Sequence, residues 1–340
     1  MKKTTVCLTA LFVCCTMLLP TAAANKIEIT SDEEELEFVE HDAVSGKDTN
    51  FTLDDLDDKF DIDSPNSVAK YDSAAGGYYT EPVMPEWVKS DDNMMSAGAG
   101  TADPDNVISG SPYSRVTDVK ARPYCMNTLI LCRWDHEGEG SVYATATGFM
   151  VGQKVMVTAG HVFWDPSEGG YPTEVRIFVR YDKSGNYYSL NNETDYYHPK
   201  AWVLSANFTT STPNKEYDWC YVTLFTPVGK TITGYYGMSS YDVPKNKEII
   251  LSGYPADYKN YSYEMFHQYK SSGLMNKYTD YTVTHTCSTR EGHSGSALSS
   301  VNYVAWGIHT AGINPKLNGG VRFAPYLYKL IVNKINSTNE

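Results

Sequence analysis

Three short segments of this sequence carry side chains that could together activate a hydroxyl group. They are TAGHV at 158–162, YDWC at 217–220 and GHSGS at 292–296. A serine hydroxyl is a weak nucleophile until a base takes its proton, and the base needs an acid that fixes its tautomer. His161, Asp218 and Ser294, in this order with gaps of 57 and 76 residues, supply those roles. We therefore expect nucleophilic catalysis at Ser294.

Taken singly, each segment also has an ordinary structural explanation. A lone histidine after a strand is usually a loop residue, and an aspartate at a strand end is a common turn residue. A stretch rich in Gly and Ser is often a plain loop, although small residues also let the backbone turn sharply and expose a hydroxyl. The three segments are specific only together, because one chain then provides nucleophile, base and acid.

The elements that must position these side chains are short β-strands. From Val107 onward, runs rich in Val, Ile, Tyr and Thr recur between turns of Gly, Pro, Asn and Asp, which is typical of an all-β protein. The sequence predicts strands at 128–132, 142–147, 154–158, 175–181, 221–225, 248–251, 281–286 and 303–309. A helix is expected only near the end, where Leu327, Leu330, Ile331 and Ile335 keep helical spacing. The strand pattern alone fits one large barrel, a sandwich or two packed barrels.

Charge divides the 340-residue chain into two parts. The formal net charge is −13, yet residues 25–105 hold 22 Asp and Glu against 5 Lys, whereas residues 106–340 are nearly neutral. A nucleic-acid surface would need a basic stripe, so we expect no nucleic-acid partner. Hydrophobic residues make up 41 % of the chain, which is enough for a packed core.

The first 24 residues are typical of a secretory signal. Two lysines at positions 2 and 3 precede an apolar run over 6–19, and three alanines at 22–24 supply a cleavage motif. The apolar run is shorter than the ~20 residues that span a membrane. We therefore expect a signal peptide at 1–24, a secreted protein and no membrane partner.

Residues 25–105 are interpreted as an acidic propeptide. Four acidic residues stand in a row at 32–35, and six Asp residues crowd into 54–63. Such self-repulsion argues against an independent core. The small and polar stretch 95–105 fits a cleavable linker. We expect the propeptide to keep the protein latent until it is removed, and a permanent acidic tail is the alternative.

Four cysteines follow the signal, namely Cys125, Cys132, Cys220 and Cys287. Their spacing matches no zinc site, and the sequence implies no metal or organic cofactor. Four cysteines allow three full pairings. A local bridge between Cys125 and Cys132 and a pair of reduced core thiols are both compatible with the sequence.

The chemical segments and several further motifs together resemble a known family. The motifs are NVIS at 106–109 with RVT at 115–117, TAGH at 158–161, YDW at 217–219, GYP at 253–255 with Asp257, GHSGS at 292–296, GIH at 307–309 and NG at 318–319. They resemble the chymotrypsin-like serine peptidases, and specifically the secreted bacterial glutamyl endopeptidases, over roughly residues 107–337. This chain departs from the pattern at Arg290 and Glu291, where the family has small residues, and at His293, where it has Asp or Asn.

The resemblance implies two packed antiparallel β-barrels with a C-terminal helix. The first barrel would span 106–228 and carry His161 and Asp218, and the second would span 229–340 and carry Ser294. In such enzymes the serine attacks the peptide carbonyl, the histidine transfers protons and the aspartate orients the histidine. The amides of Gly292 and Ser294 would form the oxyanion hole.

The resemblance further implies a binding site for the glutamate side chain of the substrate. Thr289 and His309 stand five residues before and fifteen residues after Ser294, as in the family pattern, and the new N-terminus at Asn106 would lie nearby. We expect a monomer that cleaves proteins or peptides after Glu, and less readily after Asp. A serine peptidase of other specificity and a catalytically silent secreted binding protein on the same scaffold are the alternatives.

Overall fold

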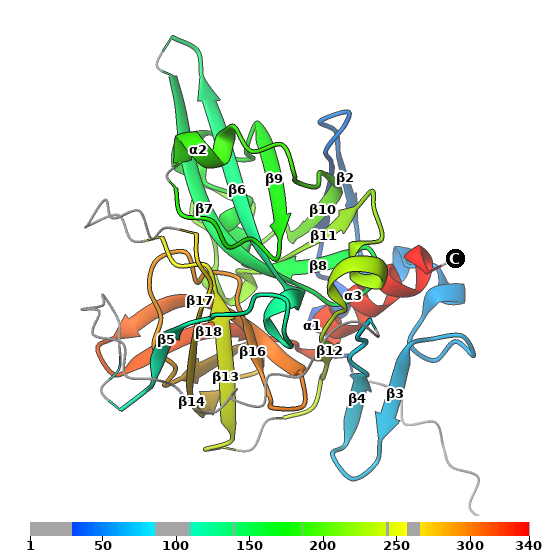
Figure 1. Ribbon diagram of the computed structural model, residues 1–340. Coiled ribbons are helices and arrows are strands. Elements are labelled where there is room, and N and C mark those ends of the chain that lie inside the picture. Colours follow the sequence, from blue (N-terminus) through cyan, green and yellow to red (C-terminus); the bar gives the residue numbers. More distant parts are fainter. Residues whose placement is uncertain are drawn as a thin grey trace, which may run out of the picture.

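A computed structural model describes residues 29–85, 108, 110–138, 140–185, 187–242, 245–256 and 266–339. Two β-barrels lie side by side, and the C-terminal helix runs along the first one (Figure 1). The strands are β1 Phe38–Asp42, β2 Asp48–Phe51, β3 Ala69–Asp72, β4 Gly77–Thr80, β5 Tyr113–Arg115, β6 Asn127–His136, β7 Gly140–Met150, β8 Val155–Thr158, β9 Glu174–Val179, β10 Pro199–Ser205, β11 Cys220–Leu224, β12 Gly237–Met238, β13 Glu248–Gly253, β14 Tyr269–Tyr278, β15 Thr282–His285, β16 Ala297–Ser299, β17 Val304–Asn314 and β18 Leu317–Arg322. The α-helices are α1 Ser31–Glu34, α2 Tyr187–Asn191 and α3 Pro325–Thr338. The all-β, two-barrel prediction is therefore confirmed.

The first barrel is built from antiparallel neighbours in the order β10-β11-β8-β7-β6-β9. A bridge between Ile177 in β9 and Tyr197, just before β10, closes the ring. Its longest pairing joins β6 to β7 over ten residue pairs, from Asn127↔Phe149 to His136↔Gly140. This long hairpin carries one wall of the candidate site described below.

The second barrel closes because β17 pairs with both β16 and β18. Its ring runs β17-β16-β13-β14-β15-β18, and β5 pairs with Tyr269–Ser271 of β14, the end of the strand that β15 does not reach. All eight predicted strands coincide with observed strands, whereas β1 to β5, β10, β12, β14, β16 and β18 were not predicted. Tyr269–Tyr278 in β14 alternates polar and small residues with few apolar ones, so it lacks the hydrophobic signal of a buried strand.

Helix α3 confirms the prediction of a C-terminal helix. Proline stands in its first turn, where the missing amide hydrogen is not needed. The four spaced residues Leu327, Leu330, Ile331 and Ile335 are all buried against the first barrel. Within the described ranges, no helix is long and apolar enough to cross a membrane.

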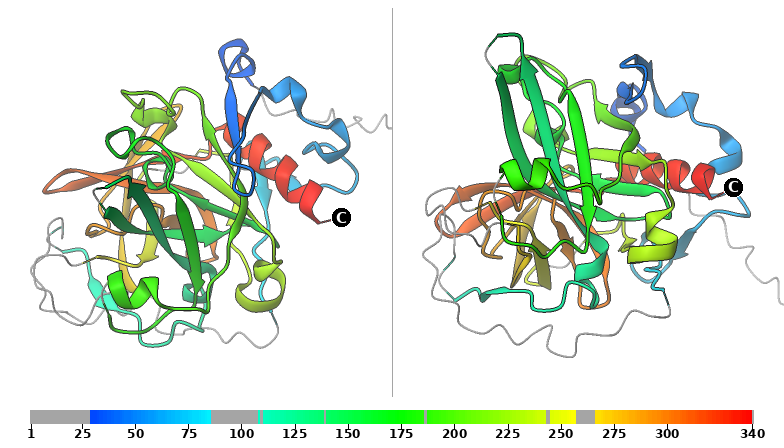
Figure 2. Two further views of the ribbon diagram at one scale, coloured as in Figure 1. Left: turned by 90° about the horizontal axis from the view of Figure 1, so that it is seen from above. Right: turned by 45° about the horizontal axis from the view of Figure 1, so that its top comes forward.

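The described part of the acidic segment, residues 29–85, is called the leader from here on. It lies beside α3 and the first barrel in every view (Figures 1 and 2). Five of its buried apolar side chains belong to one hydrophobic cluster with residues of the first barrel and α3. These side chains are Leu36, Phe38, Leu53, Ile62 and Tyr78. The expected signal peptide at 1–24 and linker at 95–105 lie outside the described residues, and removal of the propeptide stays a prediction.

The four cysteines are buried and carry no disulfide. Cys132 donates its thiol hydrogen to the carbonyl of Val162, 3.2 Å away, at the turn that carries His161. Burial raises the pKa of Cys125 to about 12 and raises that of the other three further. Of the two possibilities left open by the sequence, the structure has the reduced core thiols.

Candidate active site

His161 is held in a tight turn that directly follows β8. The strand ends at Thr158, and a single 3-10 turn over Gly160–Val162 carries the histidine out of the barrel. Gly160 lies against the ring of Phe208 and the backbone of Trp219, and a Cβ there would come within 3.0 Å of both. The imidazole itself remains 40 % exposed. The turn thus anchors the backbone and leaves the ring accessible.

The carboxylate of Asp218 binds the residue His161 three times. Its Oδ2 and Oδ1 lie 2.9 and 3.1 Å from Nδ1 of the imidazole, and Oδ1 also accepts the backbone amide of His161 at 2.9 Å. A carboxylate accepts hydrogen bonds, so Nδ1 carries the proton and Nε2 keeps its lone pair. The predicted pairing of base and acid is therefore present in the geometry.

The pKa of His161 reflects two opposing influences. Burial disfavours the imidazolium and lowers the pKa, whereas the charge and hydrogen bond of Asp218 raise it. The carboxylate prevails, so the pKa of His161 lies above the ordinary value of 6.5. The ring is a stronger base than a free histidine, which suits proton abstraction near neutral pH.

Asp218 is positioned by aromatic neighbours on both sides. A 3-10 turn over Lys215–Tyr217 leads into it, and Trp219 follows it directly before β11. The indole nitrogen of Trp219 donates to the hydroxyl of Tyr326 in α3 at 3.0 Å. Only 8 % of the Asp218 side chain is exposed. The C-terminal helix therefore helps to fix the acid, although 108 residues separate the two in sequence.

Ser294 lies in a loop whose backbone requires glycine at two positions. Gly292 and Gly295 have φ angles of +87° and +89°, which side chains rarely adopt. A Cβ on Gly292 would collide with the carbonyl of Tyr254, and one on Gly295 with the carbonyl of Thr147. Gly295 thus lies against β7 of the first barrel and Gly292 against the segment after β13 of the second, and these close approaches explain the two glycines in the GHSGS motif.

Ser294 and His161 line one cavity of about 210 Å³. Its remaining walls come from the hairpin of β6 and β7 and from the turn after His161. The hydroxyl of Ser294 donates to the carbonyl of Thr310 at 3.4 Å and makes no hydrogen bond to His161. Catalytic hydrogen bonds are often long before substrate binds. The three predicted side chains thus share one site, with base and acid in direct contact.

Within the described residues, the amides of Gly292 and Ser294 have no hydrogen-bond partner. The neighbouring backbone groups of the loop do form hydrogen bonds. The Ser294 carbonyl accepts the amide of Thr147 at 2.9 Å, and the amide of His293 donates to the carbonyl of Arg290 at 3.1 Å. Two uncommitted amides beside a nucleophile are the donors that an oxyanion hole needs.

Thr147 in β7 connects the nucleophile loop to the first barrel, and the sequence analysis did not identify it. Its hydroxyl donates to the carbonyl of Gly292 and accepts the amide of Tyr254, both at 2.8 Å. Its own carbonyl accepts the hydroxyl of Thr158 at 2.7 Å. Nothing in the local sequence marks this threonine, because its partners are distant along the chain.

Thr289 and His309, the candidates for substrate specificity, are both buried. The backbone of His309 bonds the nucleophile loop twice, to Gly295 and Ser296 at 2.8 Å. Burial and the charge of His161 lower the pKa of His309 to about 3, so its ring is neutral. Asn106, the third candidate, and Asp257 of the GYP motif lie outside the described residues.

His285 lies behind His309 and was also missed. Its Nε2 is 3.1 Å from Nδ1 of His309, and both rings are buried. Burial, together with the repulsion that two protonated rings would suffer beside each other at His309, holds the pKa of His285 well below its usual range. The contact orients the ring of His309. No motif contains His285, since it comes from β15, the strand that β18 separates from β17.

His293, next to the nucleophile, is buried and neutral. Burial, with His309 and Arg290 nearby, holds the pKa of His293 well below its usual range. Its Nε2 lies 3.2 Å from the hydroxyl of Tyr113 in β5. The guanidinium of Arg290 lies over the same Tyr113 ring, 5.5 Å from its centre. The strand after the expected N-terminus therefore contacts the nucleophile loop through a tyrosine.

Among the described residues, no group of three His, Cys, Asp or Glu side chains is placed to hold a metal ion.

Comparison with curated proteins finds similarity to "Glutamyl endopeptidase" of Bacillus licheniformis, 26 % identical over 68 % of this chain and 70 % of that protein. "Extracellular metalloprotease" of Bacillus subtilis is 22 % identical over 73 % of this chain and 75 % of that protein.

Solved structures share the fold. A Glu endopeptidase in complex with MPD superposes with a TM-score of 0.56 at 22 % identity, over 68 % of this chain and 99 % of the other. The protease Anisep of Arthrobacter nicotinovorans gives a TM-score of 0.50 at 16 % identity, over 66 % of this chain and 99 % of the other. The family model "Trypsin" matches residues 133–330, more than half of the sequence. With its two barrels, this chain therefore belongs to the trypsin family of chymotrypsin-like serine peptidases.

Proposed function

We propose that this protein is a secreted serine endopeptidase that hydrolyses peptide bonds after Glu and, less readily, after Asp. The observation that carries the proposal is the contact of His161 with Asp218 beside a cavity that Ser294 also lines. The name of the relative from Bacillus licheniformis supports the preference for Glu. Proteins and peptides are the substrates.

The three side chains carry out the reaction in two halves. The Ser294 oxygen bonds to the scissile carbonyl carbon while its proton passes to Nε2 of His161. The C–N bond then breaks, and His161 returns that proton to the leaving amine. A water molecule then attacks the acyl-enzyme ester while His161 takes its proton. The bond to the Ser294 oxygen breaks, His161 returns the proton to that oxygen, and the peptide leaves with a new carboxyl end. Asp218 stabilises the imidazolium in both halves, and the amides of Gly292 and Ser294 bind the oxyanion.

Thr289 and His309 would bind the carboxylate of the substrate's glutamate side chain. A buried carboxylate is stable only when hydrogen-bond donors surround it, and a hydroxyl with an imidazole supplies such donors. The new N-terminal amine at Asn106 would add a positive charge. Since His309 is neutral in the free protein, binding of a carboxylate favours its protonation.

Processing precedes activity in this proposal. Residues 1–24 would direct export, and cleavage before Asn106 would cut the chain between the acidic propeptide 25–105 and the barrels at 106–228 and 229–340. The mature protein would act as a monomer. N-terminal sequencing of the secreted protein tests both cleavage sites.

The decisive experiment is a cleavage map of an unstructured protein by the exported protein after it has been cut before Asn106. Ser294→Ala is the control, and a peptide pair that differs only in Glu or Gln before the scissile bond isolates the charge. We expect cuts mainly after Glu, loss of at least 10³-fold in the control, and little cleavage of the Gln peptide.

The other outcomes separate the alternatives. Cuts that depend on Ser294 but follow other residues would keep the peptidase and reject the glutamate site at Thr289 and His309. Absence of cleavage by folded, correctly trimmed protein would favour a secreted binding protein on the same scaffold.

A further inference from the structure

The leader, residues 29–85, extends the sheet of the first barrel. Strand β1 pairs with β10 over five residue pairs, from Phe38↔Ser205 to Asp42↔Ala201. The carbonyl of Glu37 accepts the amide of Ala206 at 2.9 Å, so the pairing continues beyond the strand. Strand addition of this kind satisfies the backbone groups of an open sheet edge. The leader is thus part of the barrel sheet.

Phe38 of β1 is completely buried behind the candidate acid. The centre of its ring lies 5.9 Å from that of Trp219 and 6.3 Å from that of Tyr326. Trp219 follows Asp218 directly and donates its indole hydrogen to Tyr326. The leader therefore packs against the two aromatic residues that hold Asp218 in place.

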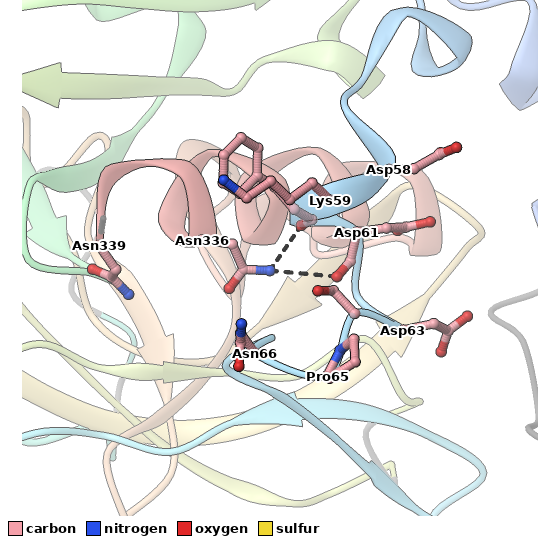
Figure 3. Close-up of a pocket in the computed structure, with 10 residues that line it drawn as sticks. Asp58, Lys59, Asp61, Asp63, Pro65, Asn66, Asn336 and Asn339 are labelled. Carbon is pink, nitrogen blue, oxygen red and sulfur yellow. Dashed lines mark hydrogen bonds between the residues drawn. The ribbon is translucent and has the colours of Figure 1, made fainter.

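The polar face of α3 is directed at the leader. Asn336 donates Nδ2 to the carbonyl of Phe60 at 2.8 Å and accepts the amide of Val68 through Oδ1 at 3.0 Å. Figure 3 shows this amide pointing into the loop at 58–66, beside a cavity of about 790 Å³. Lys334 adds an ion pair to Glu40 at 2.8 Å. The nitrogen and the oxygen of the buried Asn336 amide thus both form hydrogen bonds with backbone groups of the leader.

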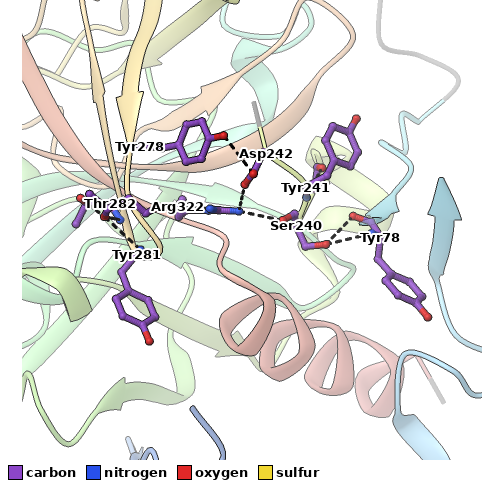
Figure 4. A network of polar contacts seen from close by, with 10 residues as sticks. Tyr78, Ser240, Tyr241, Asp242, Tyr278, Tyr281, Thr282 and Arg322 are labelled. Carbon is purple, nitrogen blue, oxygen red and sulfur yellow. Dashed lines mark hydrogen bonds and ion pairs between the residues drawn. The ribbon is translucent and has the colours of Figure 1, made fainter. Parts of the chain in front are cut away.

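A third contact joins β4 to the segment 235–242 that connects the barrels. The amide and carbonyl of Tyr78 both bond the hydroxyl of Ser240 at 3.1 Å (Figure 4). Arg322 of β18 holds the same connection, through the Ser240 carbonyl at 3.2 Å and an ion pair with Asp242 at 2.8 Å. The leader therefore contacts three parts of the molecule, namely β10, α3 and the segment 235–242 between the barrels.

The catalytic cavity lies elsewhere. Its lining residues come from β6, β7, the turn after His161 and Ser294, and none belongs to the leader. The described leader residues therefore support the site from behind and do not occupy it.

We propose that the leader is a retained subunit of the mature protein. When the chain is cut between residues 86 and 107, residues 29–85 stay bound to the barrels without a covalent link and keep Asp218 positioned. Separation would expose Phe38 and the other leader side chains of the shared core, and would remove the partners of Asn336. This inference goes beyond the proposed function; it rests on the cut between leader and barrels proposed there, but not on peptidase activity.

Controlled cleavage of the full exported chain tests retention. A recognition sequence for a site-specific protease is inserted within 95–105 in a Ser294→Ala background, so that the protein's own activity plays no part. After cleavage, size-exclusion chromatography at 0.15 M and 1 M NaCl should show both fragments eluting together in equal amounts. Release of the leader at either salt concentration would overturn the proposal.

Two matched pairs of variants locate the interface. Phe38→Ala is compared with Val44→Ala, whose valine is 75 % exposed in the same leader. Asn336→Ala is compared with Asn339→Ala, an exposed asparagine at the end of the same helix. We expect Phe38→Ala and Asn336→Ala to release the cut leader at least tenfold faster than their controls. If Phe38→Ala does not fold, the asparagine pair decides, and equal rates there would contradict the inference.

A third measurement separates support from inhibition. With Ser294 intact, kcat of the cut protein should fall when Asn336→Ala releases the leader and should stay unchanged in Asn339→Ala. A rise of kcat on release would show the leader to be an inhibitor and would refute the supporting role. If no variant has peptidase activity, the proposed function fails, whereas the chromatography still decides whether the leader is retained.

Discussion

At the scale of single residues, Thr147 is the position whose replacement should be most informative. Thr147→Val keeps the shape but leaves the carbonyl of Gly292 and the amide of Tyr254 without their partner. An orphaned buried group costs about 1–3 kcal/mol, and a shift of the nucleophile loop lowers kcat by roughly tenfold or more. We expect both losses, measured by chemical unfolding and by steady-state kinetics.

Thr223→Val is the matched control for this prediction. Thr223 is also buried in a strand of the first barrel, and its hydroxyl has no hydrogen-bond partner among the described residues. Its replacement should leave both stability and kcat nearly unchanged. Equal effects of the two variants would mean that Thr147 has no special part in holding the loop.

The pH dependence of activity should report the pairing of His161 with Asp218. The base must be neutral to accept the proton of Ser294, so kcat/KM should rise with pH and level off above an apparent pKa higher than 6.5, because Asp218 raises the pKa of His161. Asp218→Asn removes that charge and should shift the inflection to lower pH, with a loss of about 10⁴-fold in kcat. An inflection that does not move would exclude this carboxylate as the cause.

At the scale of elements, strands β15 and β17 and the nucleophile loop bury three neutral histidines. His285, His293 and His309 all have pKa values well below the ordinary 6.5. The unfolded chain therefore binds more protons than the folded chain below pH 6.5, and folding stability is lost as pH falls through that range. Each such group contributes about 1.4 kcal/mol per pH unit.

We therefore expect the free energy of unfolding to fall steeply as the pH is lowered, and replacement of one buried histidine should make this fall less steep. The free energy of unfolding between pH 6 and pH 4 should depend less steeply on pH in His285→Gln than in the wild type, whatever its absolute stability. His198→Gln, at an exposed position, should keep the wild-type slope. His161 acts in the opposite direction and in another window, since its raised pKa stabilises the fold below 6.5 and this contribution fades as pH rises above it. An unchanged slope in His285→Gln would mean that the ring is protonated in the folded state.

At the scale of the whole molecule, the fold is held by its core and its strand pairing, with no disulfide among the described residues. The four buried thiols have raised pKa values and therefore little reactive thiolate. We expect the same Tm with and without a thiol reductant, and labelling of all four cysteines by maleimide only after unfolding. A Tm that falls on reduction would reveal a bridge.

The acidic leader is attached to the nearly neutral body of the molecule mainly by apolar contacts. The sequence separates an acidic segment from a nearly neutral body, and the structure joins the two through Phe38 and the other apolar side chains of the leader. Lys329 and Lys334 in α3 face Asp61 and Glu40 of the leader. Surface pairs of this kind contribute little each, so apolar burial provides most of the attachment.

Local patterns in the sequence were sufficient for eight of the eighteen strands in the described residues, for α3 and for the candidate site residues. Runs rich in β-branched residues and Tyr between turn residues marked eight strands, and helical spacing marked α3, because these signals depend on neighbours within a few residues. His161, Asp218 and Ser294 were found by type, by order and by family resemblance, and the structure brings them to one site. The strands without a hydrophobic signal, such as β14, were missed for the same local reason.

Contacts between distant parts of the chain were decided only by the tertiary structure. Thr147 and His285 acquire their partners through strand pairing across and within the barrels, which no local pattern encodes. The leader looks unstructured by composition, because its few apolar residues are too sparse to form a core alone. They are buried only when β10 and α3 supply the other half of the packing surface. The sequence by itself therefore determined the strands with a strong local signal and the candidate site residues, and long-range packing decided which residues hold them in place.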